Sequence, residues 1–434
     1  MTSRQASLLE QVLVFYVLLI YSFSVTYSVP FRFEPPLLLL LFQRAAKFIA
    51  VLMPLVFFLR QPGVFFRCLT ESKTLLFFVV VCLASTLWSA RPLITLKEVS
   101  LLFLCFSFAG YLACNFSLPN MLFLVLGCNL VGAFCTLVLW WLYPQEAWAS
   151  TSIGEFGDTL FGLKGSYLHK NFLGFGMNLS ILSLLFLYSM RQIWGWLVIP
   201  LLVLFGFLLL CSHSATNYVS LLGILGSWGL VRWGAQLNSS KRRGFLSLIS
   251  LLVFALVIGC LANLPLILTK LNRNETLTGR TQIWGHVWEA IQNRPWLGYG
   301  FNSFWPTQAE LTQFPEASSI WSKLAWPAFH AHNGYLDLVL SLGILGVFAF
   351  GVFLVAHIHN LVRRFLQFNQ DEREVTVAGF GLCLWLVVLS INSVESFLLN
   401  TRYYALVLLF YLVLLTGSSM RSKKIPMNLF WPKE

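Results

Sequence analysis

The sequence turns polar at Thr278-Gly279-Arg280-Thr281-Gln282-Ile283-Trp284, and again at His330-Ala331-His332-Asn333-Gly334-Tyr335-Leu336. Apolar segments of membrane-spanning length stand on both sides of this region. We therefore expect a fold in which membrane helices hold the two polar signatures together on one face.

Composition supports that expectation. Hydrophobic residues make up 58% of the 434 residues and charged residues make up 11%, which predicts an all-α, polytopic membrane protein. Apolar runs fall at residues 8–28, 36–59, 73–90, 93–114, 120–143, 171–190, 193–211, 214–231, 244–267, 334–356, 375–393 and 398–416, so we expect about twelve transmembrane helices. Residues 1–267 would hold the first nine helices, residues 268–333 a large outer loop with short amphipathic helices, and residues 334–434 the last three helices and a tail.

The basic residues predict the orientation of the bundle. With the amino terminus in the cytoplasm, the inner loops and tail carry Arg60, Arg67, Lys73, Arg191, Arg232, Lys241, Arg242, Arg243, Arg363, Arg364, Arg373, Arg421, Lys423 and Lys424. The short outer loops keep only Arg32, Arg91, Lys164 and Lys170. Both termini are therefore expected in the cytoplasm. The net charge of +12 then follows largely from orientation, with anionic membrane lipid as a partner and no nucleic acid.

Residues 281–293 predict a short amphipathic helix, with Ile283, Trp284, Val287, Trp288 and Ile291 on one face. Arg280 stands at its amino end, where a cation opposes the helix dipole by about 0.3–1 kcal/mol. Free backbone N–H groups, the dipole and the guanidinium would together favour a bound anion. The alternative is that Arg280 only pairs with Glu275 or Glu310.

His332 is the candidate general base. A neutral imidazole can take a proton from a hydroxyl, and Asn333 or Asp337 could orient the ring. The alternative is a structural histidine at the junction of a loop and a helix. No metal site is expected, because His330 and His332 are two residues apart and no carboxylate cluster accompanies them. No cofactor is expected either, since the chain has no Walker-type glycine-rich loop.

Other cations are candidate ligands for an anion. Arg44 and Lys47 lie at membrane depth in the second predicted span, where they would line a substrate path, or else snorkel or pair with Glu98. Lys170 ends a glycine-punctuated outer loop that is either a site or an interfacial anchor. Arg91 lies in an outer turn.

Three blocks resemble the signature of the O-antigen ligase/polymerase family of bacterial membrane glycosyltransferases. They are Gly279-Arg280-x-x-x-Trp284, Pro295-x-Leu297-Gly298-x-Gly300-x-x-x-Phe304 and His330-x-His332-Asn333-x-Tyr335-Leu336. Trp88-Ser89-x-x-Pro92, His169-Lys170-Asn171-x-x-Gly174 and Ser212-x-Ser214-x-Thr216 resemble its exopolysaccharide-polymerase branch.

The resemblance implies a GT-C-like fold in the bacterial inner membrane, with one large periplasmic loop. It also implies a metal-independent, inverting transfer of an undecaprenyl-diphosphate-linked glycan to an acceptor hydroxyl at the periplasmic face. Arg280 would hold the diphosphate and His332 would activate the hydroxyl. Arg44, Lys170, Arg91, His330 and Asn333 are further substrate-binding candidates. Ala215 stands where many ligase-type members have an arginine.

Three functions remain open from the sequence. The first is a polymerase that joins repeat units into exopolysaccharide or O-antigen, with a chain-length regulator as a partner. The second is a ligase that moves finished glycan to lipid A-core in lipopolysaccharide assembly. The third is a glycolipid transporter or flippase, although the chain does not show the two matched halves usual in transporters.

Overall fold

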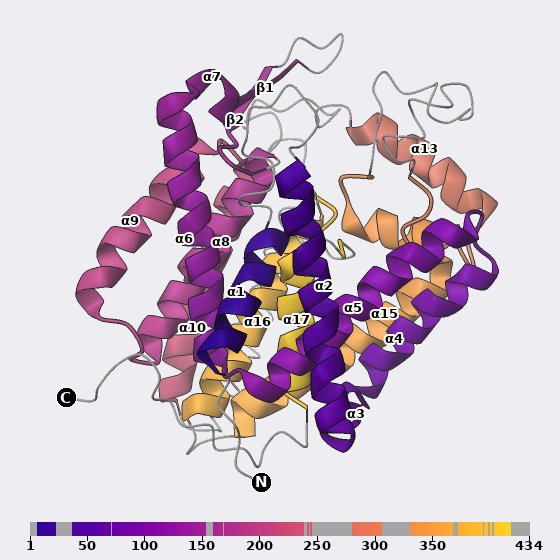
Figure 1. The fold of residues 1–434 in the computed structure, drawn as a ribbon, viewed down its shortest axis with the longest axis horizontal. Helices are drawn as coiled ribbons and strands as arrows, with labels where there is room; N and C mark the ends of the chain where they lie inside the picture. The colour runs from indigo at the N-terminus through magenta and orange to yellow at the C-terminus, as the bar shows by residue number, and fades with distance from the viewer. Residues whose placement is uncertain are drawn as a thin grey trace.

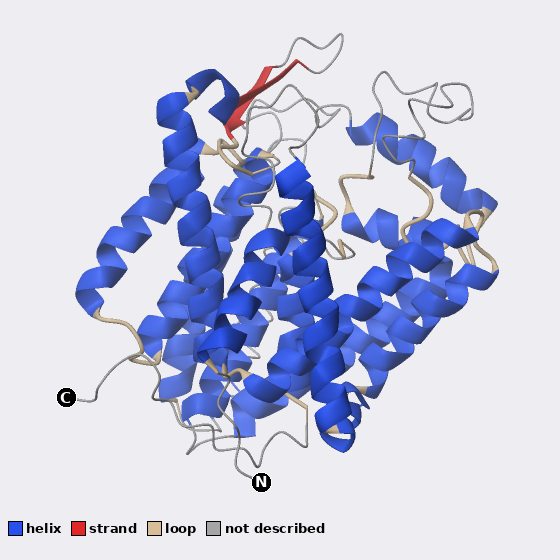
Figure 2. Ribbon diagram, viewed as in Figure 1, coloured by secondary structure: helices blue, strands red, loops and turns tan. Residues whose placement is uncertain are grey.

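The protein is an almost entirely helical bundle (Figure 1, Figure 2). The computed structural model describes residues 7–22, 37–70, 72–152, 159–167, 169–237, 241–242, 244, 280–305, 330–367, 372–393, 395–397, 400–401 and 403–417. Its helices are α1 (Leu8–Tyr21), α2 (Leu37–Arg60), α3 (Pro62–Thr70), α4 (Lys73–Ala84), α5 (Pro92–Asn115), α6 (Leu118–Leu142), α7 (Pro144–Ala147), α8 (Lys170–Ser189), α9 (Gly195–Cys211), α10 (Ala215–Gln236), α13 (Arg280–Asn293), α15 (Gly334–Gln367), α16 (Glu372–Asn392) and α17 (Tyr404–Leu415). The predicted all-α, polytopic fold is confirmed.

The helices follow the predicted membrane spans closely. A helix occupies part of every predicted range except residues 244–267, of which only residue 244 is described. Among the described residues, 5 helices are long and apolar enough to cross a membrane, namely Pro92–Asn115, Leu118–Leu142, Lys170–Ser189, Gly334–Leu366 and Glu374–Asn392. Shorter apolar helices cover Leu8–Tyr21, Lys73–Leu87, Gly195–Cys211 and Tyr404–Leu415. The total of twelve spans stays a prediction.

Helices α8 and α17 form the centre of the bundle. Every residue from Tyr404 to Leu414 in α17 is buried, as are most residues of α8. The sequence of α17 is apolar on all sides, which suits a helix with neighbours all around. Helix α17 packs on α5, and α8 packs on α6, α9 and α10 (Figure 1).

The bundle has two distinct ends. At the first, called the α13 end, the beginning of α15 meets the end of α16, since the Gly334 N–H donates to the Glu395 carbonyl at 3.2 Å. At the other, called the Arg364 end, Arg364 of α15 pairs with Glu374 of α16 at 2.5 Å and donates to the Thr416 carbonyl after α17 at 2.6 Å. A helix rises about 1.5 Å per residue, so α8 separates the two ends by about 30 Å, the thickness of a bilayer core.

A turn at residues 295–300 packs backbone to backbone against a break in α15. Gly343 has φ 62° and ψ −160° inside that helix, and a Cβ there would lie 2.4 Å from the Trp296 backbone. In the turn, Gly298 has φ 65° and Gly300 has φ 102°. Only glycine allows both this backbone geometry and this close approach. The turn is therefore fixed to α15 by backbone contacts on both sides.

The segment before α8 contains a small element that was not predicted. Strand β1 (Trp148–Ser152) pairs with β2 (Thr159–Leu163) in an antiparallel hairpin next to α7 (Figure 2). The chain then turns at Gly165, where φ is 55° and a Cβ would clash with Thr136. The hairpin therefore leads the chain directly into α8.

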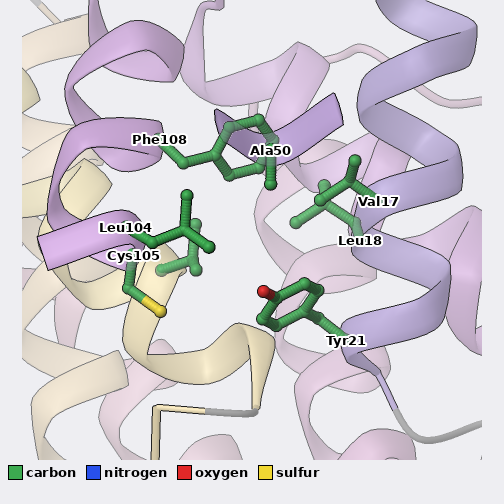
Figure 3. A pocket seen from close by; sticks show the side chains of 8 residues that line it. Val17, Leu18, Tyr21, Ala50, Leu104, Cys105 and Phe108 are labelled. Carbon is green, nitrogen blue, oxygen red and sulfur yellow. The ribbon is translucent and has the colours of Figure 1, made fainter. Parts of the chain in front are cut away.

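A small apolar gap lies between α1, α2, α5 and α17. Figure 3 shows the side chains around it, with the Tyr21 hydroxyl pointing across it towards Leu104 and Cys105. Its volume is about 10 Å³, which is at most enough for one water molecule. This gap is a packing defect and cannot hold a substrate.

Candidate active site

The candidate active site is built around the carboxylate of Glu395, which follows α16 at the α13 end. Glu395 is buried, with 8% of its side chain exposed. Its Oε1 lies 3.3 Å from Nη2 of Arg280 and accepts a hydrogen bond from Nδ2 of Asn171 at 2.5 Å. Its Oε2 lies 3.4 Å from Nδ1 of His332. One buried anion thus joins three segments that are far apart in the sequence.

Arg280 is the first residue of α13, as the sequence predicts. The helix buries Ile283, Val287 and Ile291 against α15 and the turn at residues 299–305, whereas Trp288 is 56% exposed and does not belong to the buried face. The Arg280 side chain is 21% exposed. It therefore borders open space while it pairs with Glu395. Glu275 and Glu310, the partners considered from the sequence, lie outside the described residues.

His332 lies on the other side of the same carboxylate. Its backbone has φ 48°, a left-handed conformation that costs a histidine about 1–2 kcal/mol. Nδ1 is buried and has no hydrogen-bond partner among the described residues, since 3.4 Å to Glu395 is a long contact. The ring as a whole is 32% exposed. Such an imidazole is held near an anion and can still reach a ligand.

The backbone next to His332 is fixed from both directions. The Ala331 carbonyl accepts a hydrogen bond from Trp284 Nε1 of α13 at 2.9 Å. The Ala331 N–H donates to Asp337 Oδ2 at 3.1 Å, and Trp305 Nε1 donates to Oδ1 of the same carboxylate at 2.7 Å. Asp337 therefore positions the peptide before His332. The expectation that it orients the imidazole ring is not what the structure shows, because the carboxylate facing that ring belongs to Glu395.

Two sequence motifs meet behind Glu395. Asn171 donates to Glu395, and its Oδ1 accepts a hydrogen bond from Ser214 Oγ at 2.9 Å. Asn217 donates to Ser214 Oγ at 2.9 Å and to the Asn171 carbonyl at 3.1 Å. Gly174 leaves room for this contact, since a Cβ there would lie 2.5 Å from the Asn217 amide. The beginnings of α8 and α10 thus hold Asn171 in place.

The ionisable groups of the site have shifted pKa values, and these shifts determine which groups are charged near neutral pH. Burial alone raises the pKa of the Glu395 carboxyl, but contact with His332 and the charge of Arg280 outweigh burial and hold that pKa well below its usual range. Burial lowers the pKa of His330 to about 3 and that of His169 to about 4. Near neutral pH these two imidazoles are therefore uncharged, and Glu395 is ionised.

A possible metal-ligand set is present at the same place. One ligand atom each from His330, His332 and Glu395 lies within 4.8 Å of the others. Two imidazoles and a carboxylate suit a divalent cation such as zinc. Oε1 of this carboxylate already faces Arg280 and Asn171, so a cation would compete with the guanidinium. The sequence did not indicate this set, because its carboxylate comes from residue 395. The expected absence of a metal stays a prediction.

The structure brings some of the other predicted residues to the cluster. The His330 and His332 rings lie 4.0 Å apart between centroids, and His330 Nδ1 accepts the His332 N–H at 3.1 Å. Lys170 is buried beside Asn171 at the start of α8. Asn333 caps α15, with its Oδ1 accepting the N–H groups of Tyr335 and Leu336.

Arg91 and Arg44 are placed elsewhere. Arg91 donates to the carbonyls of Ser303 and Trp305, the latter at 2.7 Å, and so ties the start of α5 to the turn after Gly300. Its geometry indicates a structural clamp, which is a different role from the predicted diphosphate contact. Arg44 lies on the exposed side of α2, and no ion pair joins it to Glu395 among the described residues.

Glu395 itself was missed by reasoning from the sequence. It belongs to none of the motifs, and its partners are at least 63 positions away in the chain, with Asn171 separated by 224 and Arg280 by 115. One signal was available. A single acidic residue at the end of an apolar segment is costly to bury, and such a residue is therefore a candidate functional residue.

The sequence also matches known proteins. Residues 200–351 match a family model described as O-antigen ligase. This range includes Arg280, the glycine turn and the histidine pair. The helical fold and the motifs agree with this match, and over residues 200–351 the chain is similar to the O-antigen ligase family.

One curated relative is similar over a large part of the chain. It is the exopolysaccharide production protein ExoQ of Rhizobium meliloti (strain 1021), which is 26% identical over 258 residues. The similarity covers 56% of this chain and 58% of the relative. The chain therefore spans little more than half the length of that protein.

Proposed function

We propose that the protein is a membrane glycosyltransferase that polymerises undecaprenyl-diphosphate-linked oligosaccharide repeat units into exopolysaccharide or O-antigen. The observation that carries the proposal is the convergence of Arg280 and His332 on the buried Glu395 carboxylate. The family match and the name of the relative, an exopolysaccharide production protein, support the choice of product class.

The reaction consists of three changes: a bond forms, a bond breaks and a proton is transferred. The acceptor hydroxyl forms a bond from its oxygen to the anomeric carbon of the donor sugar. The bond between that carbon and the diphosphate oxygen breaks, and its electron pair leaves with the undecaprenyl diphosphate. The hydroxyl proton goes to His332. Attack from the face opposite the leaving group inverts the configuration at the anomeric carbon.

Each charged residue has a separate role in this scheme. Arg280 offers a guanidinium fork to the diphosphate and compensates the charge that develops on the leaving group. His332 accepts the proton, and Glu395 stabilises the resulting imidazolium across the present 3.4 Å gap. Asn171 keeps the Glu395 carboxylate in place. Glu395 touches no reacting atom, so it is a positioning residue.

A ligase that transfers finished glycan to lipid A-core is the second candidate, because the matching family model carries the description O-antigen ligase. The chemistry at the donor would be the same, and only the acceptor differs. Ala215 begins α10 where many ligase-type relatives have an arginine, and this difference favours polymerisation.

Purified full-length protein given lipid-linked oligosaccharide alone tests the proposal. Longer glycans together with free undecaprenyl diphosphate are expected. Product that forms only after lipid A-core is added would assign the protein as a ligase, and no product with either acceptor would favour a transporter.

The same assay tests independence from metal ions. Activity in the presence of a chelator is expected to equal activity without it. Loss of activity that a divalent cation restores would instead assign His330, His332 and Glu395 as metal ligands.

A further inference from the structure

A second cavity lies at the Arg364 end, on the opposite side of the bundle from Glu395. It has a volume of about 500 Å³ and is enclosed by the last turns of α8 and α10, the first turns of α16, and Arg242. These helices pack side by side (Figure 1). The cavity is about 30 Å from Glu395 along α8, so it is not part of the candidate active site.

The lining of the cavity combines three arginines with an apolar wall. Arg191, Arg232 and Arg242 supply positive charge, whereas Phe186 and Val231 are apolar. The nearby Glu374 is engaged by Arg364 at 2.5 Å. The arginines therefore keep the cavity positively charged. A cationic wall next to an apolar wall suits a ligand that has both an anionic group and a hydrocarbon chain.

The arginines have different tasks. Arg242 donates to four backbone carbonyls, those of Gly234, Ala235, Leu237 and Phe365, at 2.6–3.0 Å. It thus closes the end of α10 and adds a fixed positive charge. Arg191 and Arg232 are both exposed, so their guanidinium groups are available to a ligand that enters the cavity.

Arg191 occupies a position that normally suits glycine. It ends α8 with φ 55°, and its N–H donates to the Tyr188 carbonyl at 3.0 Å. A left-handed residue after a helix is usually glycine, and another residue there costs about 1–2 kcal/mol. Backbone stability therefore does not explain the arginine, whereas its side chain at the mouth of a positive cavity does.

Three exposed tryptophans lie close in the chain to the arginines of the cavity. Trp194, Trp196 and Trp233 lie within five residues of Arg191 or Arg232 along the chain, and 45%, 67% and 55% of their surfaces are exposed. Tryptophan side chains exposed at the end of a membrane helix are typical of the headgroup layer. Trp228 closes the inner side by donating to Ser189 Oγ at 3.0 Å.

We propose that this cavity binds the phosphate headgroup of an anionic phospholipid, with Arg191 and Arg232 contacting the phosphate and the apolar wall contacting the first part of an acyl chain. Basic pockets between membrane helices are suited to such headgroups. The site is separate from the proposed glycosyl transfer and does not depend on it.

Native mass spectrometry of the full-length protein tests this proposal. Wild-type protein is expected to retain dioleoylphosphatidylglycerol in preference to dioleoylphosphatidylcholine, which has the same chains. The double variant Arg191→Gly/Arg232→Gln should lose about tenfold or more in retention of the anionic lipid, because each basic residue contributes to headgroup affinity. Arg60→Gln, which removes an exposed cation at the end of α2 outside the cavity, should retain the lipid as wild type does.

Two results would overturn the proposal. One is equal retention of the anionic lipid by wild type and the double variant. The other is binding of glycerol 3-phosphate as tight as binding of the lipid, which would make the cavity a site for a free anion. The single variant Arg191→Gly keeps the test valid if the double variant does not fold, because glycine suits the left-handed backbone at that position.

Discussion

The pairing of Arg280 with Glu395 makes a specific demand on the side chain at position 280. A guanidinium can face a carboxylate and a diphosphate with separate N–H groups, whereas an ammonium is a point charge. Arg280→Lys is therefore expected to lower glycosyl transfer at least about tenfold, since hydrogen bonds to charged groups contribute about 1.5–3 kcal/mol. Turnover of lipid-linked oligosaccharide by the purified variant measures this loss.

Arg294→Lys is the matched control for that variant. Arg294 follows the opposite end of α13, and its guanidinium lies 5.0 Å from the centre of the Tyr299 ring. The same change there should leave turnover close to that of wild type. If Arg280→Lys also turned over at the wild-type rate, the guanidinium would have no role in holding the diphosphate.

The lowered pKa of His330 predicts how the stability of the folded protein depends on pH. The pKa of His330 is about 3 in the folded protein, against an ordinary value of 6.5. Below about pH 6.5 the unfolded chain therefore binds a proton that the folded protein does not, and stability falls as pH falls. The slope per such histidine is at most about 1.4 kcal/mol per pH unit. Thermal unfolding in detergent between pH 6.5 and pH 5.5 should be less sensitive to pH in His330→Asn than in wild type.

His286→Asn serves as the control for the pH measurement. His286 lies on α13 at 3.6 Å from Glu289, outside the cluster. Its variant measures how much removal of a histidine outside the cluster changes the dependence on pH. Glu395 does not disturb the comparison, because its ordinary pKa of 4.5 lies below the chosen range and its folded pKa is lower still. An unchanged slope in His330→Asn would show that His330 is not buried in its neutral form.

Single residues also show what sequence reasoning could and could not provide. Arg280 and His332 were identifiable because each stands in a short motif with recognisable chemistry. Glu395 was not, since its importance comes from a position between segments that only the folded chain brings together. Arg91 shows a related difficulty. A cation in an outer turn is available to a substrate or to backbone carbonyls, and local sequence does not distinguish the two.

At the scale of elements, the break in α15 has a direct test. Gly343→Ala would place a Cβ where φ is 62° and the Trp296 backbone is 2.4 Å away. This backbone region is nearly exclusive to glycine and costs other residues about 1–3 kcal/mol. The variant should therefore melt at a clearly lower temperature than wild type in a detergent thermal-unfolding assay.

Gly351→Ala is the control within the same helix. A Cβ at Gly351 has no neighbour within 4 Å, so alanine should stabilise the helix by about 0.5–1 kcal/mol. If both variants melted at the same temperature, the close contact between the turn and α15 would be unnecessary for the fold.

The glycine turn illustrates why element contacts escape the sequence. Gly298 and Gly300 predict a turn correctly, but not what the turn touches. Its partner is the unusual backbone at Gly343, and Trp88 Nε1 donates to the Leu297 carbonyl at 2.8 Å from the other side. Two motifs that resemble family signatures are thus structural partners of each other. Periodicity and composition contain no information on such pairing.

For the whole molecule, the charge distribution predicts the orientation in the membrane. Alkaline phosphatase fused after Leu142 follows five predicted spans and should be active in the periplasm, whereas the same enzyme fused at the carboxyl terminus should be inactive in the cytoplasm. A green fluorescent protein fusion should give the opposite pattern. An active phosphatase at the carboxyl terminus would mean that the number of spans after Leu142 is even.

The helical architecture was the part most accessible from the sequence. The length of an apolar run is enough to predict a spanning segment. The observed helices overlap the predicted ranges, although α15 continues to Gln367, beyond the predicted end at residue 356, and α17 begins at Tyr404, after the predicted start at residue 398. The hairpin β1–β2 and the burial of α17 were not accessible in the same way. A chain rich in hydrophobic residues does not distinguish a helix that faces lipid from a helix that faces other helices.

The interruption of α15 at Gly343 affects how this helix responds to changes in the thickness of the bilayer. The long part of the helix below the break must tilt when the surrounding hydrocarbon becomes thinner or thicker. Because the peptide geometry at Gly343 does not continue the helix, we expect that tilt to stop there instead of reaching His332. The imidazole would then keep its distance from the carboxylate while the lipid composition of the cell changes.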